Sequence, residues 1–257
     1  MVNRETVLTT EKLTKRFGGL LALHQVDVKI HRGEIVGLIG PNGSGKTTLF
    51  NCVSGFYKPE EGKVFLKGEE ITSLQAHQIA RKGVSRTFQL AKLFSHMSVI
   101  ENLIIAKHLT NEAGFVSSLF RSKRYRHAED RAEHEARELL HLVDLDDKRP
   151  AVAKDLPYGS QRLLTLAIAL SSNPELILLD EPTAGMNQEE SEKLATILRR
   201  INQKGVTLFL VEHNMRFVMK LAERIIALNH GEVICEGTPQ VVSNDEAVIS
   251  AYLGGKL

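Results

Sequence analysis

The sequence predicts an α/β protein whose strand-rich core is interrupted by an all-helical insertion. Strand patterns fill the first part of the chain and return after residue 175, whereas the stretch from about 100 to 172 carries only helical patterns. This order indicates one core with an inserted helical part. We therefore expect a single domain over 1–257, with the core formed by 1–90 and 173–257 and a helical subdomain over 91–172.

The expected strands follow from the spacing of apolar residues. Val26, Val28 and Ile30 alternate with Asp27 and Lys29, which is the two-residue period of a half-buried strand. The run EIVGLIG predicts a strand that is buried on both faces. Its range is 34–40, and the other expected elements are strands at 63–68, 176–180 and 206–212 and a hairpin around His230 and Gly231.

Composition excludes several classes of protein. The formal net charge is +2, which gives no reason to expect a nucleic-acid partner. Cys52 and Cys235 fit no metal or redox spacing, so we expect two reduced thiols in a reducing compartment. The N-terminus lacks the pattern of a signal peptide, and no apolar run approaches the length of a membrane span. A cytoplasmic protein is the resulting expectation.

A glycine-rich stretch, GPNGSGKTT, lies between an expected buried strand and an expected helix that starts near Lys46. This is the context in which the G-x-x-x-x-G-K-[ST] motif binds nucleotide phosphates through inward N–H groups and a helix N-terminus. Lys46 would reach the β- and γ-phosphates, and the Thr47 hydroxyl would reach Mg²⁺. The predicted nucleotide-binding residues are Gly40, Pro41, Asn42, Gly43, Ser44, Gly45, Lys46, Thr47 and Thr48.

Two carboxylates follow the expected strand at 176–180. Asp180 stands where the aliphatic run ends, a position suited to holding Mg²⁺. Glu181 comes next and could act as the general base toward an attacking water. Asp-Glu-Pro alone could simply end a strand, but the phosphate-binding motif favours the catalytic interpretation.

With these and four further motifs, the chain resembles the ATP-binding subunits of ABC transporters. The resemblance rests on Gln89 in RTFQLAKLF, on LPYGSQ at the place of the LSGGQ signature, on His213 in LVEHNM and on Phe17 in TKRFGG. It implies a P-loop NTPase core with a mixed sheet and antiparallel N-terminal strands, and it implies ATP and Mg²⁺ as cofactors. Phe17 would stack on adenine, Gln89 would contact Mg²⁺ and take part in catalysis with Lys46 and His213, and the signature would bind nucleotide through Tyr158, Gly159, Ser160 and Gln161.

The signature departs from the family pattern. Pro157 stands where the signature serine usually donates to the γ-phosphate, and proline offers neither a hydroxyl nor an N–H. Either that contact is lost, or Ser160 replaces it. Asn187, in AGMN, stands where the family often has an acidic residue.

These departures narrow the resemblance to the ATPases of branched-chain amino acid importers of the LivG type. The supporting features are the tyrosine-glycine signature, TAGMN, VEHNM and a tail that reads EGTP…YLG. The resemblance implies head-to-tail pairing with a second ATP-binding subunit, identical or not, on integral membrane permease subunits. It implies a periplasmic or extracellular solute-binding protein as an indirect partner, no nucleic acid, and a peripheral location on the cytoplasmic face of the inner membrane.

Other ABC ATPase functions are alternatives to branched-chain amino acid import. A lipopolysaccharide-export or urea-uptake ATPase would share the single cassette, although the former follows LSGGQ more closely. A soluble ABC ATPase of nucleic-acid repair would insert a long coiled coil between Gly45 and Gly159, and this stretch is too short and lacks sustained heptads. Translation types carry two cassettes in one chain, and this chain has one.

Overall fold

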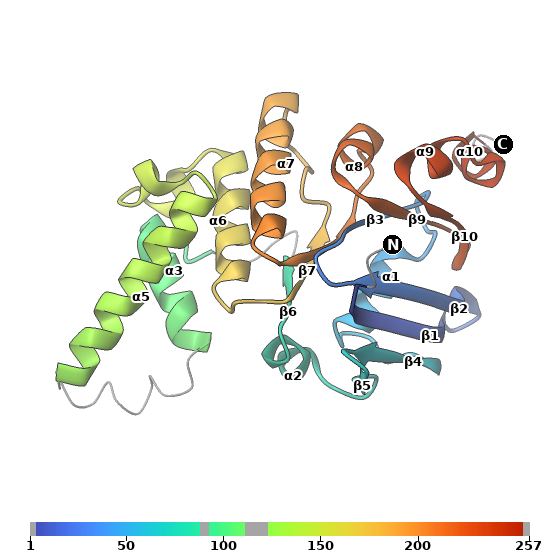
Figure 1. Ribbon diagram of the computed structural model, residues 1–257, viewed down its shortest axis with the longest axis horizontal. Coiled ribbons are helices and arrows are strands. Elements are labelled where there is room, and N and C mark those ends of the chain that lie inside the picture. Colours follow the sequence, from blue (N-terminus) through green and yellow to red (C-terminus); the bar gives the residue numbers. More distant parts are fainter. Residues whose placement is uncertain (1–3, 88–92, 111–122, 254–257) are drawn as a thin grey trace. The chain divides into compact units, whose positions relative to one another are not determined.

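The computed structural model describes residues 4–87, 93–110 and 123–253. The chain divides into two units (Figure 1). The first unit comprises 1–86, 175–183 and 202–257, and the second comprises 87–174 and 184–201. The domain boundaries expected from the sequence stay a prediction; in the structure, the stretch 184–201 belongs to the second unit.

The first unit contains an antiparallel sheet near the N-terminus. Its order is β2-β1-β4-β5, formed by β1 (Thr6–Phe17), β2 (Leu20–His31), β4 (Glu61–Leu66) and β5 (Glu69–Glu70). Along β2, Val26, Val28 and Ile30 are buried while Asp27 and Lys29 are exposed, as the alternation predicts. The antiparallel strands implied by the family resemblance are therefore present.

The second sheet of this unit has six strands in the order β10-β9-β3-β8-β7-β6. The strands β3, β7, β8 and β9 run parallel, and β10 pairs antiparallel with β9. Parallel strands covered on both faces are apolar throughout, which explains why their sequences do not alternate. The bounds are β3 (Ile35–Ile39), β6 (Val84–Thr87), β7 (Leu176–Asp180), β8 (Thr207–Val211), β9 (Arg224–Asn229) and β10 (Glu232–Gly237).

Helix α1 (Lys46–Val53) follows β3 and joins the core that both sheets share. The rings of Phe50 on α1 and Phe209 on β8 pack at a centroid distance of 4.9 Å. Cys52 is buried in the same core, and burial raises the pKa of its thiol to about 12. The other helices of the unit are α2 (Ala76–Arg81), α8 (Met215–Leu221), α9 (Pro239–Ser243) and α10 (Glu246–Leu253).

The second unit is helical, as expected. It contains α3 (Val99–Thr110), α5 (Lys123–Leu142), α6 (Tyr158–Leu170), the short 3₁₀ helices η1 (Asp146–Lys148) and η2 (Ala153–Asp155), and most of α7 (Gln188–Gln203). Ser98 and Glu101 form a capping box at the start of α3: the Ser98 N–H donates to the Glu101 carboxylate, and the Glu101 N–H donates to the Ser98 hydroxyl. Within the described ranges, no helix combines the length and hydrophobicity needed to cross a bilayer.

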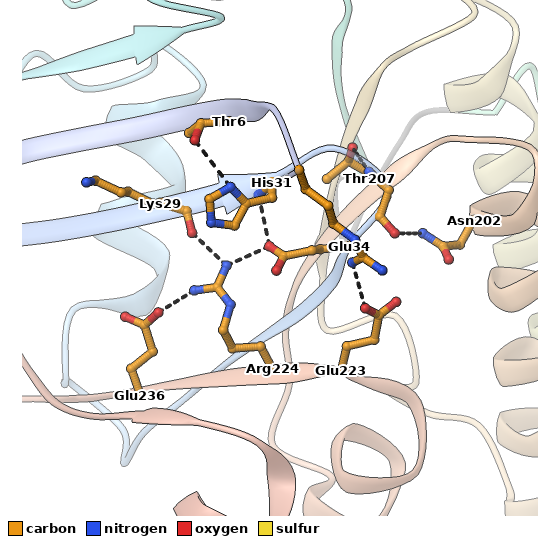
Figure 2. A network of polar contacts seen from close by, with 11 residues as sticks. Thr6, Lys29, His31, Glu34, Asn202, Thr207, Glu223, Arg224 and Glu236 are labelled. Atoms are coloured by element: carbon orange, nitrogen blue, oxygen red, sulfur yellow. Dashed lines mark hydrogen bonds and ion pairs between the residues drawn. The ribbon is translucent and has the colours of Figure 1, made fainter. Parts of the chain in front are cut away.

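A polar network closes the amino end of the parallel strands in the first unit (Figure 2). Glu34, which precedes β3, accepts from the His31 N–H at 2.8 Å and from the Arg224 guanidinium at 2.6 Å. Arg224 also pairs with Glu236 and donates to the Lys29 carbonyl at 2.7 Å. The buried carboxylate is thus balanced by a cation, as burial of charge requires.

Candidate functional site

The phosphate-binding motif forms the turn between β3 and α1. Gly45 has φ 105° and ψ 0°, in the region that favours glycine, and a Cβ there would lie 2.5 Å from the Ala22 carbonyl oxygen. A Cβ on Gly40 would lie 2.1 Å from the Leu228 carbonyl oxygen. The loop therefore runs so close to neighbouring backbone that only glycine fits at these two positions.

Lys46 folds back over this loop. Its ammonium group donates to the carbonyl oxygens of Gly40 at 2.7 Å and Pro41 at 2.8 Å, and the residue is 5% exposed. Burial lowers the pKa of Lys46, and the nearby charge of Glu181 opposes this shift. The cation is thus held inside the loop that is predicted to bind phosphate.

A cavity of about 330 Å³ brings most of the predicted residues of the first unit together. Phe17, at the end of β1, is 42% exposed, and its ring forms a T-shaped pair with the Tyr57 ring at 5.2 Å between centroids. The Lys15 ammonium lies 5.2 Å from the centroid of the same ring. The cavity is lined by Phe17, Leu20, Leu21, Ala22, Asn42, Gly43, Ser44, Gly45, Lys46, Thr47, Thr48, Glu181 and His213.

Glu181 lies directly after β7 and adopts a strained backbone conformation. Its φ is +46°, which is uncommon for a residue with a Cβ, and its N–H donates to the Val211 carbonyl at 2.9 Å. The His213 Nε2 atom lies 2.9 Å from a Glu181 carboxylate oxygen. Strained residues of this kind concentrate at functional sites. The structure thus places the predicted general base, Glu181, in contact with the predicted catalytic histidine, His213.

Asp180 has a partner that the sequence did not reveal. The Arg86 guanidinium donates to its carboxylate at 2.7 Å, with side chains that are 7% and 14% exposed. Arg86 also donates to the Asn51 amide oxygen at 2.6 Å and to the Ser54 hydroxyl at 2.9 Å. The contact with Asp180 joins residues 94 positions apart, so no local pattern could indicate it.

The predicted donors for a metal ion are the Thr47 hydroxyl, on a residue that lines the cavity, and the Asp180 carboxylate, which is paired with Arg86. The third predicted donor, Gln89, lies outside the described residues. Hard oxygen donors of this type suit Mg²⁺, which is usually held by one or two protein groups together with phosphates and water. Among the described residues, no group of three or more histidines, cysteines and carboxylates could hold a metal by itself. The oxygen chemistry of the predicted donors would suit a magnesium ion that binds together with nucleotide phosphates.

The signature residues lie in the second unit, at the start of α6. The Tyr158 hydroxyl accepts from two nitrogens of Arg162 at 3.0 and 2.7 Å, and the Tyr158 side chain is exposed. A Cβ on Gly185 would lie 2.9 Å from the Tyr158 ring, and one on Gly159 would lie 2.6 Å from the Glu190 carboxylate. Close packing within this unit thus accounts for both glycines.

Ser160 and Gln161 already have partners within the second unit. Lys148 donates to the Ser160 hydroxyl at 2.9 Å, and the Gln161 amide donates to the Leu156 carbonyl at 2.9 Å. The Ser160 hydroxyl accepts in this bond, so its proton remains available for a second one.

Asn187 caps helix α7. Its side-chain oxygen accepts from the Glu190 N–H at 2.9 Å, and the Glu190 carboxylate accepts from the Asn187 N–H at 3.0 Å. This reciprocal pair is a capping box. The departure from an acidic residue therefore keeps the helix start intact, since Asn and Asp are equally good caps.

Comparison with known proteins identifies the family. Residues 23–184 match the family described as ABC transporter, and residues 232–256 match the family described as branched-chain amino acid ATP-binding cassette transporter. The chain belongs to the ABC transporter family. It is an ATP-hydrolysing subunit of this family, and the resemblance inferred from its motifs is confirmed.

Relatives and solved structures of this family match nearly end to end. The chain is 41% identical to the high-affinity branched-chain amino acid transport ATP-binding protein BraF of Pseudomonas aeruginosa, over 96% of this chain and 98% of BraF. It is 41% identical to LivG of Escherichia coli K12, over 97% and 98%. The ADP conformation of an ABC transporter cassette superposes with a TM-score of 0.84 at 30% identity, over 97% and 99%. The predicted ABC ATPase fold is confirmed.

Proposed function

We propose that this ABC ATPase drives the import of branched-chain amino acids by binding and hydrolysing ATP at the cavity between Phe17 and Glu181. The observation that carries the proposal is the convergence of the phosphate loop, Glu181 and His213 on that cavity. The solute is proposed from the printed names of BraF and LivG, which both describe branched-chain amino acid transport.

Nucleotide binding would use the first unit. Phe17 offers an exposed ring for the adenine base, and this ring packs against Tyr57. The phosphates would take the place of the Gly40 and Pro41 carbonyls as partners of the Lys46 ammonium. Exchanging neutral acceptors for anionic oxygens strengthens each hydrogen bond of this cation.

Hydrolysis would depend on Glu181 and His213. Glu181 would accept the proton of the attacking water, because it lines the cavity that would hold the phosphates. His213 would hold that carboxylate in place through the 2.9 Å contact. Thr47, Asp180 and Gln89 would hold Mg²⁺, which would stabilise charge on the phosphates when bound.

The signature would act on a second subunit. In head-to-tail pairing, the start of α6, with Tyr158, Gly159, Ser160 and Gln161, would close over the nucleotide of the partner, and the reverse contact would close the second site. A solved bacterial ABC transporter cassette with a TM-score of 0.75 at 26% identity is dimeric, which supports the pairing of two subunits. The motor would act on integral permease subunits, served by a solute-binding protein, from the cytoplasmic face of the membrane.

Uptake measurements test this proposal. In cells that lack the gene for this chain, radiolabelled leucine, isoleucine and valine uptake should fall, and the wild-type gene should restore it. The Glu181→Gln variant should not restore uptake, while the Glu189→Gln variant, changed at an exposed position on α7, should do so. Unchanged branched-chain uptake in the deletion strain would contradict the proposed solute, and restored uptake by Glu181→Gln would contradict the proposed base.

A further inference from the structure

Glu212 is a buried carboxylate that takes no part in the proposed binding or hydrolysis of ATP. It directly follows β8 and is 2% exposed. Removing a charged carboxylate from water is costly unless the site supplies several hydrogen bonds. The hydrogen-bond partners of Glu212 must therefore explain why its carboxylate is buried.

Four neutral donors surround this carboxylate. One oxygen accepts from the Thr183 N–H at 2.7 Å and from the Thr183 hydroxyl at 2.6 Å. The other accepts from the N–H groups of His213 at 2.9 Å and Asn214 at 3.1 Å. Each oxygen thus serves a different segment: one binds the loop after β7, and the other binds the loop after β8.

These contacts link Glu212 to Glu181 and His213, the two residues proposed to act in hydrolysis, in a closed ring of residues. Glu181 lies two residues before Thr183, and its carboxylate meets His213, whose own N–H is held by Glu212. The ring therefore runs from Glu181 through Thr183, Glu212 and His213 back to Glu181. Because Glu181 holds an unfavourable φ of +46°, its conformation must be maintained by contacts outside the residue itself.

We propose that Glu212 is a positioning residue that sets the spacing between Glu181 and His213. Its two carboxylate oxygens hold the loop after β7 and the loop after β8 at the end of β8; we call this arrangement the clamp. The clamp leaves the phosphate loop untouched, so nucleotide affinity does not depend on it. This inference rests on the proposed roles of Glu181 and His213.

The Glu212→Gln variant breaks the clamp with little change of shape. The amide keeps one acceptor oxygen but replaces the other with a donor NH₂ group, which would face N–H donors on either side. One of the two loops must then shift. Misplacement of catalytic groups by about 1 Å can lower rates by about 10²-fold.

Glu34 provides a matched control. It is also a buried glutamate, 9% exposed, and it also accepts a backbone N–H, but it lies at the amino end of the parallel strands (Figure 2). The Glu34→Gln variant removes one of the two carboxylate charges that balance Arg224 and should lower the melting temperature. It should not change kcat of the folded protein.

The experiment measures kcat and KM for ATP, the affinity for a fluorescent ATP analogue and the melting temperature of the full chain. For Glu212→Gln we expect kcat to fall roughly ten- to a hundredfold. Analogue affinity should stay within about twofold of the wild type, because the phosphate loop is unchanged. Thr183→Val, which loses the hydroxyl donor, should lower kcat less, and Thr183→Ser should restore it.

Several outcomes would overturn the inference. These are a kcat for Glu212→Gln within twofold of the wild type, a parallel loss of kcat in Glu34→Gln, or equal activity of Thr183→Val and Thr183→Ser. If Glu212→Gln fails to fold, the two Thr183 variants decide alone. A Glu181→Gln variant that keeps full turnover would instead contradict the proposed function, so the two failures are distinguishable.

Discussion

Two helix starts in this chain are assigned to the same ligand but are built in opposite ways. Helix α1 begins after Gly45 at φ 105°, and helix α6 begins after Pro157 at φ −53° and ψ 150°. In the described structure, neither N-cap residue makes a side-chain hydrogen bond to its own helix. The first N–H groups of both helices are therefore not capped by these side chains, as an anion-binding helix start requires.

The difference lies in what stands beside those N–H groups. The phosphate loop has a cation, Lys46, inside it, whereas the corresponding place at α6 holds a proline that offers no hydrogen bond. Lys148 stands near α6 but donates to Ser160. The proposed nucleotide site has two halves, the phosphate loop of one subunit and the signature of the other. We infer that the phosphate loop can bind nucleotide by itself, while the signature depends on backbone groups of α6. Variants of Glu181, Lys46 and Pro157 test this asymmetry.

The largest effect is expected for Glu181→Gln. The amide keeps the shape of the side chain but cannot accept the proton, so turnover should fall by about 10²- to 10⁴-fold. ATP binding should be kept, because Lys46 and the loop are unchanged. Steady-state phosphate release and equilibrium nucleotide binding measure the two quantities. Near-normal phosphate release would remove Glu181 from the mechanism.

Lys46→Ala should instead weaken nucleotide binding. The phosphates lose a charge-assisted partner worth about 1.5–3 kcal/mol, or roughly a ten- to 150-fold loss of affinity. Titration with a fluorescent ATP analogue measures this effect. Lys63→Ala, at a surface ion pair with Glu70 on β4 and β5, is the control and should bind normally. Tight binding by Lys46→Ala would contradict the central role of the loop.

Pro157→Ser should strengthen the weaker half of the site. We expect the chain to be monomeric without nucleotide and to pair only weakly with ATP. In the Glu181→Gln background, a restored hydroxyl should raise ATP-dependent dimer affinity about tenfold or more. Sedimentation with and without Mg-ATP measures this affinity. A stable dimer without nucleotide would contradict the monomer prediction.

Pro157→Ala is the matched control, since it removes the proline without adding a hydroxyl, and it should not increase pairing. Loss of the proline lowers stability by about 0.4–1 kcal/mol, which should appear in the melting temperature and not in pairing. If Ser160→Ala weakens pairing and Pro157→Ser leaves it unchanged, then Ser160 already supplies the donor.

The smallest effect concerns Asn187. Removing its cap in Asn187→Ala should lower stability by about 1 kcal/mol, because the Glu190 N–H loses its acceptor. Asn187→Asp, which restores the residue common in the family, should leave the melting temperature nearly unchanged. Thermal unfolding of both variants measures the difference. An equal loss in the two variants would show that the helix cap is not what the asparagine provides.

Sequence reasoning could predict those features that depend on consecutive residues. The phosphate loop could be predicted because glycines, Lys46 and Thr47 follow a buried strand within nine residues. The parallel strands carried a clear apolar signal, and the end of one strand marked Asp180 and Glu181. These features are set by local backbone geometry and burial, which leave a pattern in the sequence.

It missed features that depend on contacts between distant segments. Glu212 stands 29 positions from Thr183, and as a single glutamate before a histidine it gave no sign of being buried. Strand β6 was missed as well, because four residues with two buried positions carry little periodicity. Only tertiary packing distinguishes such residues from ordinary surface groups.

The C-terminal end of the described chain reaches the phosphate loop. The Tyr252 hydroxyl meets the backbone of Gly40, and burial raises the pKa of this phenol. Ala247, Ser250 and Ala251 line a cavity of about 550 Å³ together with Pro41 to Ser44. The position of α10 beside this loop affects where the chain can be truncated or tagged for purification. A truncation that removes α10 would remove one wall of the cavity beside the phosphate loop. A purification tag is therefore better fused to the N-terminus.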